Sequence, residues 1–480
     1  MFKSFLELKK FADEKKVKMI DFKEMDLSGR WRHLTIPIER FTEDILKNGI
    51  GFDGSSYGYL TVEKSDMVFI PDISSAFLDP FTDMPAISMI GDIYEIGEPH
   101  RRFGGDPRFV AEKAEKYMAE SGVVDKCLYG PEFEFYILDN VEYRIEPGNI
   151  EVHLDSRQAH WNTIDNPYEN PSANLGRKVM SNKNYHADIP FDSSFDLRNA
   201  MVCMLEESGV PVKYHHAENG GPGQAEIEIE LATLREVSDR SQKLKYIVRN
   251  LALKNGRIVT FMPKPFFGEA GSGLHVHIQM FKNSKPVFFD KNGYSCLSET
   301  AIHAIGGILK HSEALMAFTN PSTNSYKRLV PGYEAPVTIC FATANRSSVV
   351  RIPGYTISPE EKRFEFRPPD AMANPYLAYS AITMAALDGI LSKIDPGAEG
   401  YGPFDKNMYA LTPEESAKLK KLPKSLEEAA DALEKDHDFL LAGGVFTGEL
   451  ISAQLKLIRK DAEEINIIPH PAEFKKYFDV

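Results

Sequence analysis

The sequence is poor in the features that mark secreted, membrane-spanning and nucleic-acid-binding proteins. Its 480 residues include only four cysteines, far apart and without a CxxC pair, so we expect neither disulfides nor a zinc cluster, and a cytoplasmic setting is favoured. No apolar run is long enough to span a bilayer, and no GxxxxGK[ST] phosphate loop occurs. Acidic residues outnumber basic ones by 70 to 56, and this net charge of −14 argues against a nucleic-acid partner.

What remains is the composition of a globular protein, 42% hydrophobic and 26% charged, in a chain too long for one ordinary core. The first 16 residues alternate charged with apolar types and predict an amphipathic helix, not a signal peptide. A polar segment, HRRFGGDP, follows several short strand patterns. We therefore predict an α+β protein with a small N-terminal domain, residues 1–103, and a catalytic domain, residues 104–480. Residues 140–190 lack periodicity and are predicted to be a loop-rich insertion.

Four predicted strands carry acidic or imidazole side chains at alternate positions. These side chains are Glu132, Glu134, Glu226, Glu228, His275, His277 and Glu365. If the strands are neighbours in one antiparallel sheet, one face is apolar and the other gathers carboxylates and imidazoles. Clustered carboxylates take up protons unless a cation neutralises them, and oxygen ligands with one His suit Mg²⁺ or Mn²⁺ better than Zn²⁺. The alternative, which is the stronger one for any single strand, is a solvated outer face.

A second polar cluster lies between residues 320 and 367, at the ends of two predicted strands. It consists of Arg328, Glu334, Arg346, Arg351, Arg363, Glu365 and Arg367. Arginine presents a planar fork of donors that matches phosphate and carboxylate, so the set predicts a polyanion held beside a cation or a proton acceptor. A surface network of ion pairs is the alternative. The loop GEAGSG, residues 268–273, could bring backbone N–H groups close to an anion.

Longer segments resemble those of one known family, and they occur in order along nearly the whole chain. They are FDGSS, GPEFEF, HHAENGGPGQAE, FMPKPFFGEAGSGLHVH, NPSTNSYKRLVPGYEAPV, NRSSVVRIP, KRFEFRPPDAMANPYLAYSAI and FDKNMY. Together they resemble bacterial type I glutamine synthetase. The resemblance implies a β-grasp N-terminal domain and a catalytic domain with a curved antiparallel sheet flanked by helices. It also implies a homododecamer of two hexameric rings, in which neighbouring subunits share each active site.

The resemblance implies a ligase reaction with L-glutamate, ammonium and ATP. ATP phosphorylates the γ-carboxylate of glutamate, and ammonia then displaces phosphate from γ-glutamyl phosphate to give L-glutamine. Two Mg²⁺ or Mn²⁺ ions per active site assist this reaction. A γ-glutamyl-amine ligase of the same superfamily is an alternative, but Asp53 and Glu334 favour ammonia over a bulky amine. A catalytically dead ring-forming protein would be expected to have lost metal ligands, and none is missing.

The matched motifs imply a role for each site residue. One metal would be held by Glu134, Glu218 and Glu226, and the other by Glu132, His275 and Glu365. Glutamate would contact Gly271, Arg328 and Arg367. The transferring phosphate would face Arg346 and Arg351. The nucleotide would lie along His277, Gln279 and Arg363. Ammonium would lose its proton to Asp53 of a neighbouring subunit, near Ser56 and Tyr185, under a flap that carries Glu334. Among the metal ligands, Glu218 alone rests only on the resemblance.

The sequence departs from the family pattern near the substrates. Ala270 stands where many members have Asn, and Glu360 stands where many have Lys. Glu230 and Leu231 replace an Arg-aromatic pair beside the adenine. These departures predict altered glutamate and ATP contacts with the reaction unchanged.

Tyr409 lies in the segment FDKNMY, where it resembles the tyrosine that an adenylyltransferase modifies with AMP. That modification belongs to the subclass with the longer insertion, which residues 140–190 resemble. The alternative is an ordinary loop aromatic, half packed and half wet.

Overall fold

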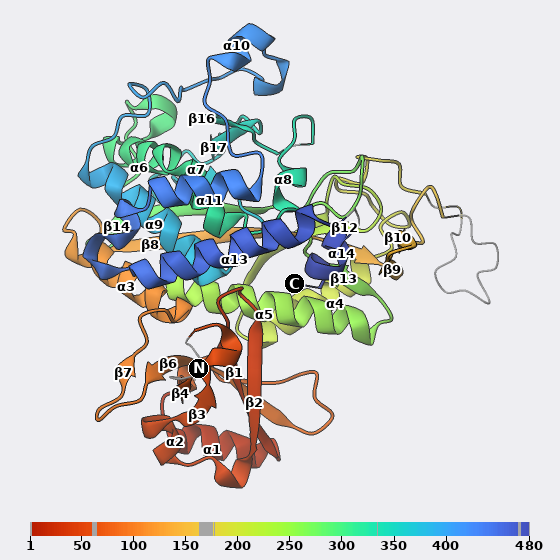
Figure 1. Ribbon diagram of the computed structural model, residues 1–480, viewed down its shortest axis with the longest axis vertical. Coiled ribbons are helices and arrows are strands. Elements are labelled where there is room, and N and C mark those ends of the chain that lie inside the picture. Colours follow the sequence, from red (N-terminus) through yellow and green to blue (C-terminus); the bar gives the residue numbers. More distant parts are fainter. Residues whose placement is uncertain are drawn as a thin grey trace.

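Two sheets organise the chain. The computed structural model describes residues 2–59, 65–162, 176, 178–333, 335–468 and 472–479. The N-terminal elements gather at one end of the molecule, below α3 (Pro107–Glu120) and α5 (Leu234–Lys254), and the rest of the chain forms the larger part (Figure 1). None of the described helices combines the length and hydropathy needed to cross a bilayer.

The N-terminal sheet has the strand order β2-β1-β6-β4-β3, and β5 and β7 also pair with β6. Its β1–β6 pair is parallel and its other pairs are antiparallel. The elements are α1 (Phe5–Glu14), β1 (Met19–Met25), β2 (Trp31–Pro37), α2 (Glu43–Asn48), β3 (Ile50–Asp53), β4 (Asp66–Pro71), β5 (Phe77–Leu78), β6 (Ala86–Glu95) and β7 (Arg101–Arg102).

Strand β1 shows why this sheet has one apolar and one polar face. Ile20 and Phe22 are fully buried in the same core as Leu8 of α1. The intervening residues point the other way, because successive strand side chains alternate. Lys23 lies 2.7 Å from Asp21 and 4.7 Å from the ring centre of Tyr246 in α5 (Leu234–Lys254). The polar face therefore packs against the larger part of the molecule.

One buried arginine joins the two parts. Arg108 of α3 (Pro107–Glu120) is 2% exposed and contacts two carboxylates of the N-terminal part, Asp72 at 2.6 Å and Asp92 at 2.7 Å. It also lies 2.9 Å from Asp239 of α5. Arg235 provides a second contact to Asp72, at 2.9 Å. These charges are removed from water and are stabilised by their ion-pair partners. Loss of one charged residue would therefore destabilise the interface between the two parts.

The large sheet carries the strands with acidic and imidazole side chains that the sequence analysis identified. Its order is β11-β12-β8-β14-β18-β17-β16, and β13 pairs with β8 and β15 with β14. All its pairs are antiparallel except β16–β17, which is parallel. The strands are β8 (Lys126–Leu138), β11 (Val212–Ala217), β12 (Gln224–Ile229), β13 (Ile258–Thr260), β14 (Leu274–Lys282), β15 (Lys285–Pro286), β16 (Thr338–Thr343), β17 (Ser348–Ile352) and β18 (Phe364–Phe366).

Helices cover the apolar face of this sheet. Phe133, Ile227, Val276 and Phe364 belong to one large core with residues of α5 and α9. The apolar sequence of α9 is buried almost all round, as expected for a central helix. The other helices of this part are α4 (Phe195–Glu207), α6 (Glu299–Lys310), α7 (Ser312–Thr319), α8 (Ser325–Arg328), α9 (Pro375–Leu391), α10 (Pro413–Ala417), α11 (Leu426–Lys435), α12 (Asp438–Leu441), α13 (Gly448–Asn466) and α14 (Ala472–Tyr477).

The insertion differs from the loop-rich prediction. Residues 140–155 form a regular hairpin of β9 (Asn140–Glu146) and β10 (Asn149–Asp155), joined across a Pro-Gly turn. Residues 178–194 are mostly turns, and residues 163–175 lie outside the described part of the chain. The expected loop therefore begins later than the sequence indicated.

Candidate active site

Strand register brings the polar residues of the large sheet together. Glu226 of β12 lies directly opposite Glu134 of β8. Glu132 of β8 lies opposite His275 of β14. The other neighbour of β14 places Glu365 of β18 opposite His277. The four strands are antiparallel neighbours, so the condition under which the sequence predicted one shared polar face is met.

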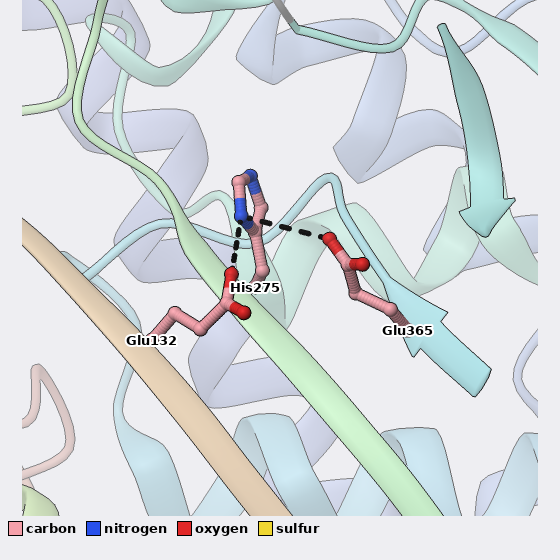
Figure 2. A group of neighbouring side chains, drawn as sticks. All are labelled: Glu132, His275 and Glu365. Carbon is pink, nitrogen blue, oxygen red and sulfur yellow. Dashed lines mark hydrogen bonds and ion pairs between the residues drawn. The ribbon is translucent and has the colours of Figure 1, made fainter. Parts of the chain in front are cut away.

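The first candidate metal group spans three adjacent strands (Figure 2). His275 Nδ1 lies 2.9 Å from Glu132 Oε2 and 3.7 Å from Glu365 Oε1, so the imidazole lies between two carboxylates. All three ligand atoms lie within 4.8 Å of one another. Burial alone would raise the pKa of Glu365, but Arg367, His277 and His275 together outweigh burial and lower that pKa to about 2.

The second group lies at the β11–β12 edge of the sheet. Glu218 follows the end of β11, and its ligand atom lies within 4.8 Å of those of Glu226 and His216. Glu134 is the cross-strand neighbour of Glu226, although it is not part of this compact group, and it accepts a hydrogen bond from the Gly273 N–H at 2.7 Å. His216 was not among the residues expected from the sequence.

The electrostatics of this second group fit a cation. Burial, followed by repulsion from Glu132 and Glu218, raises the pKa of Glu226 well above its usual range. Without a cation, Glu226 therefore takes up a proton, whereas a bound divalent ion would favour its charged form. The donor set of several carboxylate oxygens and one imidazole in each group suits Mg²⁺ or Mn²⁺.

A cleft of about 480 Å³ opens above both groups. Five arginines line it, namely Arg328, Arg346, Arg351, Arg363 and Arg367. Glu365 is shared between Arg367 and Arg351, and its Oε2 lies 2.5 Å from Arg351 Nη1. The cleft thus places carboxylates beside arginines, an arrangement that can bind metal ions and anionic groups together.

Backbone carbonyls fix the arginine at one end of the cleft. Arg328 is 3% exposed, and its Nη1 donates to the carbonyl oxygens of Pro368 at 2.7 Å and Pro369 at 3.1 Å. Gly271 lines the same end, and its carbonyl oxygen accepts a hydrogen bond from Gln224 Nε2 at 3.0 Å. A Cβ at position 271 would lie 2.4 Å from the Pro263 carbonyl oxygen, so the close approach requires glycine.

Not every residue expected at the site lines the cleft. Tyr185 does, whereas Asp53 and Ser56 belong to the N-terminal part and do not. Ser56 Oγ donates to Asp53 Oδ2 at 2.7 Å, and hydrogen bonds from Ser55 and Ser56 lower the pKa of Asp53 to about 2. Beneath the cleft, His277 is fully buried against Glu132, and Gln279 donates to the Glu360 carbonyl oxygen at 2.6 Å. Glu334 lies outside the described residues.

Comparisons with known proteins identify the family of the chain. The family described as "Glutamine synthetase, catalytic domain" matches residues 104–477, and "Glutamine synthetase, beta-Grasp domain" matches residues 16–96. The chain belongs to the glutamine synthetase family. Its N-terminal part is a β-grasp domain, and the cleft belongs to the catalytic domain of an enzyme that forms glutamine with ATP.

Similar proteins cover the chain from end to end. A glutamine synthetase of Frankia alni is 44% identical over 484 residues, which is 100% of both chains. One from Aquifex aeolicus is 44% identical over 467 residues, covering 97% of this chain and 96% of the relative. A solved structure of Plasmodium falciparum glutamine synthetase superposes with a TM-score of 0.84 at 28% identity, covering 99% of each chain.

Two features of this glutamine synthetase chain escaped the sequence prediction. His216 was missed because Tyr214, His215 and His216 are consecutive polar aromatic residues, which hide the alternation. The ion pair between Lys213 and Glu228, with an N–O distance of 2.8 Å, was missed because it depends on an irregularity in β11. Glu228 itself was part of the predicted polar face.

Tyr409 is half buried and connects two segments of the catalytic domain. Its hydroxyl donates to the Ala335 carbonyl oxygen at 2.9 Å. The preceding residue, Met408, donates its N–H to Ser347 Oγ at 3.0 Å, next to Arg346. The loop that carries Tyr409 is therefore held against Ala335 and against Ser347, the neighbour of Arg346.

Proposed function

We propose that this protein joins ammonia to the γ-carboxylate of L-glutamate through γ-glutamyl phosphate, and that the cleft described above is where it does so. The observation that carries the proposal is the juxtaposition of two metal-binding groups with five arginines in one cleft. A carboxylate is a poor acceptor for an amine, and phosphorylation converts its oxygen into a leaving group. The charge that develops during phosphoryl transfer requires the cations that this cleft provides.

The residues present fit two divalent ions. Glu132, His275 and Glu365 would hold one, and Glu134, Glu218 and Glu226, with His216 beside them, would hold the other. Bound Mg²⁺ or Mn²⁺ would neutralise phosphate charge and polarise phosphoryl oxygens.

The remaining residues bind and orient the substrates. Arg328, Arg367 and Gly271 contact glutamate, and Arg346 and Arg351 stabilise the transferring phosphoryl group. His277, Gln279 and Arg363 lie along ATP. Asp53 binds ammonium and accepts its proton as ammonia attacks, and Ser56 and Tyr185 lie beside the ammonium. The lowered pKa of Asp53 keeps this carboxylate ionised and so able to bind the ammonium cation. Glu334 excludes water from the acyl phosphate.

An assay with parallel nitrogen donors tests the reaction. With ATP and Mg²⁺, we expect phosphate release that requires both L-glutamate and ammonium, because the product forms only when both are present. Reactions with hydroxylamine, methylamine and a polyamine run beside it. Turnover with an amine but none with ammonium would contradict the proposal and identify a γ-glutamyl-amine ligase.

We further propose a homododecamer of two hexameric rings, with each site shared between neighbours. In support, Asp53 and Ser56 belong to the N-terminal part and do not line the cleft of their own chain. Co-expressed Asp53→Ala and Arg346→Ala subunits should recover activity, to roughly a quarter of wild type for random mixing, because some interfaces join two intact halves. Sizing chromatography checks the assembly. Mixed rings as inactive as either parent would exclude a shared site.

We also propose that an adenylyltransferase modifies Tyr409. The hydroxyl is half buried, so modification would require its bond to Ala335 to open. An added AMP would bring negative charge and bulk beside Arg346 and weaken the binding of anionic substrates. Protein from nitrogen-replete native cells should contain a Tyr409 peptide that is heavier than the unmodified peptide by the mass of AMP. Treatment with phosphodiesterase should return this peptide to the unmodified mass and change the activity of the enzyme. Absence of the heavier peptide would refute this regulation.

The domain boundary and the location of the enzyme complete the proposal. We place the boundary at residues 103 and 104, just before α3, so that the domains are residues 1–103 and 104–480; limited proteolysis should cleave there before it cleaves within either sheet. All four cysteines are free, which supports a cytoplasmic location that cell fractionation would test.

A further inference from the structure

The ion pair between Lys213 and Glu228 lies next to the first metal group. Glu228 is fully buried and is the cross-strand neighbour of Glu132. Ligand atoms of Glu132, Glu228 and His277 all lie within 4.8 Å of one another, which is close enough for one cation. In addition, Glu228 Oε2 has no hydrogen-bond partner among the described residues. A buried carboxylate with an unsatisfied oxygen requires a compensating cation.

A β-bulge provides that cation. Val212 and Tyr214 of β11 pair with Ile229 and Glu228 of β12, so Lys213 is the extra residue between two regular pairs. A bulge of this kind redirects a side chain from the face that alternation would give it. Lys213 Nζ reaches Glu228 Oε1 at 2.8 Å and lies 4.9 Å from the ring centre of Tyr214. The ammonium is thus held both by a carboxylate and by an aromatic face.

We propose that Lys213 is a built-in third cation of the active site, which occupies the place that a divalent ion would otherwise take at Glu132, Glu228 and His277. The inference rests on the proposed two-metal site and adds to it. The inference depends on charge balance. The two bound metal ions do not neutralise the negative charge of Glu228, whereas the Lys213 ammonium group does so at any metal concentration. Lys213 also lines the cleft, with its side chain 27% exposed, so this neutral ion pair forms part of the cleft wall.

The number of Mn²⁺ ions bound per subunit tests this assignment. It can be measured at pH 8 without nucleotide, from the electron paramagnetic resonance signal of free Mn²⁺. Wild-type protein should bind two ions. Lys213→Met should bind three, because the unpaired Glu228 becomes a ligand. Lys213→Arg keeps the cation and should bind two. Lys213→Met combined with Glu228→Gln should also return to two, because the new ligand is gone.

The outcomes separate this inference from the proposed function. Two ions in Lys213→Met, or three in the double variant, would overturn the role of Lys213. A wild-type count other than two would instead contradict the two-metal site. If Lys213→Met is too unstable for binding measurements, Mn²⁺ should raise its unfolding midpoint by more than it raises that of wild type. An equal or smaller rise would also overturn the inference.

Discussion

Replacing Glu132 with Gln should reduce glutamine formation by more than about 100-fold while leaving the fold intact. Losses of 10- to 100-fold are typical when a residue that only supports a metal ligand is removed, and Glu132 is itself in contact with two imidazoles. Its two oxygens lie 2.9 Å from His275 and 2.9 Å from His277. Glutamine keeps the shape but lacks the charge and has one acceptor oxygen in place of two, so one imidazole loses its acceptor and the metal loses an anionic ligand. Initial rates over a range of Mn²⁺ concentrations measure the effect.

A matched control separates charge from location. Glu142 lies on β9, is exposed, and does not line the cleft. Glu142→Gln removes the same charge and should leave the rate and the metal dependence unchanged. Circular dichroism should not distinguish the two variants from wild type. Wild-type rates and metal dependence in Glu132→Gln would show that the first metal group is misassigned.

Replacing Arg108 with Met should separate the β-grasp domain from the catalytic domain. The change leaves Asp72, Asp92 and Asp239 partly buried without their shared partner. Breaking a buried ion pair on one side costs about 3–5 kcal/mol, and here Arg235 still contacts Asp72 and Arg102 still contacts Asp92, so we expect a loss near the lower end of this range. Trp31 reports on the separation, because its ring lies 5.6 Å from Tyr246 across the interface. In a Trp161→Phe background, its fluorescence should change at a lower urea concentration than in wild type.

An exposed arginine of the same region provides the comparison. Arg101 pairs with Glu95, but their side chains are 80% and 31% exposed. Such surface pairs contribute at most about 1 kcal/mol, so Arg101→Met should barely move the urea midpoint. Equal midpoints for Arg108→Met and Arg101→Met would mean that the buried cluster does not hold the domains together.

The sequence was most informative where a residue's role follows from strand alternation. Glu132, Glu134, Glu226 and His275 could be placed on one face because period-two patterns survive in regular strands. Which strands are neighbours does not follow from alternation, and the structure supplied that order. Glu218 follows the end of β11 in an irregular loop, where periodicity carries no information, so only the family resemblance identified it.

The errors have equally local causes. The hairpin β9–β10 was read as loop, although Pro147 and Gly148 form a recognisable turn signal between two alternating segments. The sequence of residues 298–318 predicts one continuous helix, but the structure divides it into α6 and α7 at His311, which is 2.9 Å from Asp388 and 2.8 Å from Asp436. Such side-chain contacts between distant segments cannot be read from a helical pattern. The direction of the Lys213 side chain could not be predicted for a similar reason, because a β-bulge is defined by how its strand pairs with the neighbouring strand.

The strand order of the large sheet also has a consequence for the lifetime of the protein in the cell. Glu132 and His275 face each other across two strands, yet they are 143 residues apart in the sequence. The unfolded chain therefore contains no preformed site, and divalent ions bind only after folding. At a free concentration 100 times the dissociation constant, one such ion adds about 2.7 kcal/mol to stability. Cells starved of metal would thus hold enzyme that is less active and also unfolds and is degraded more often.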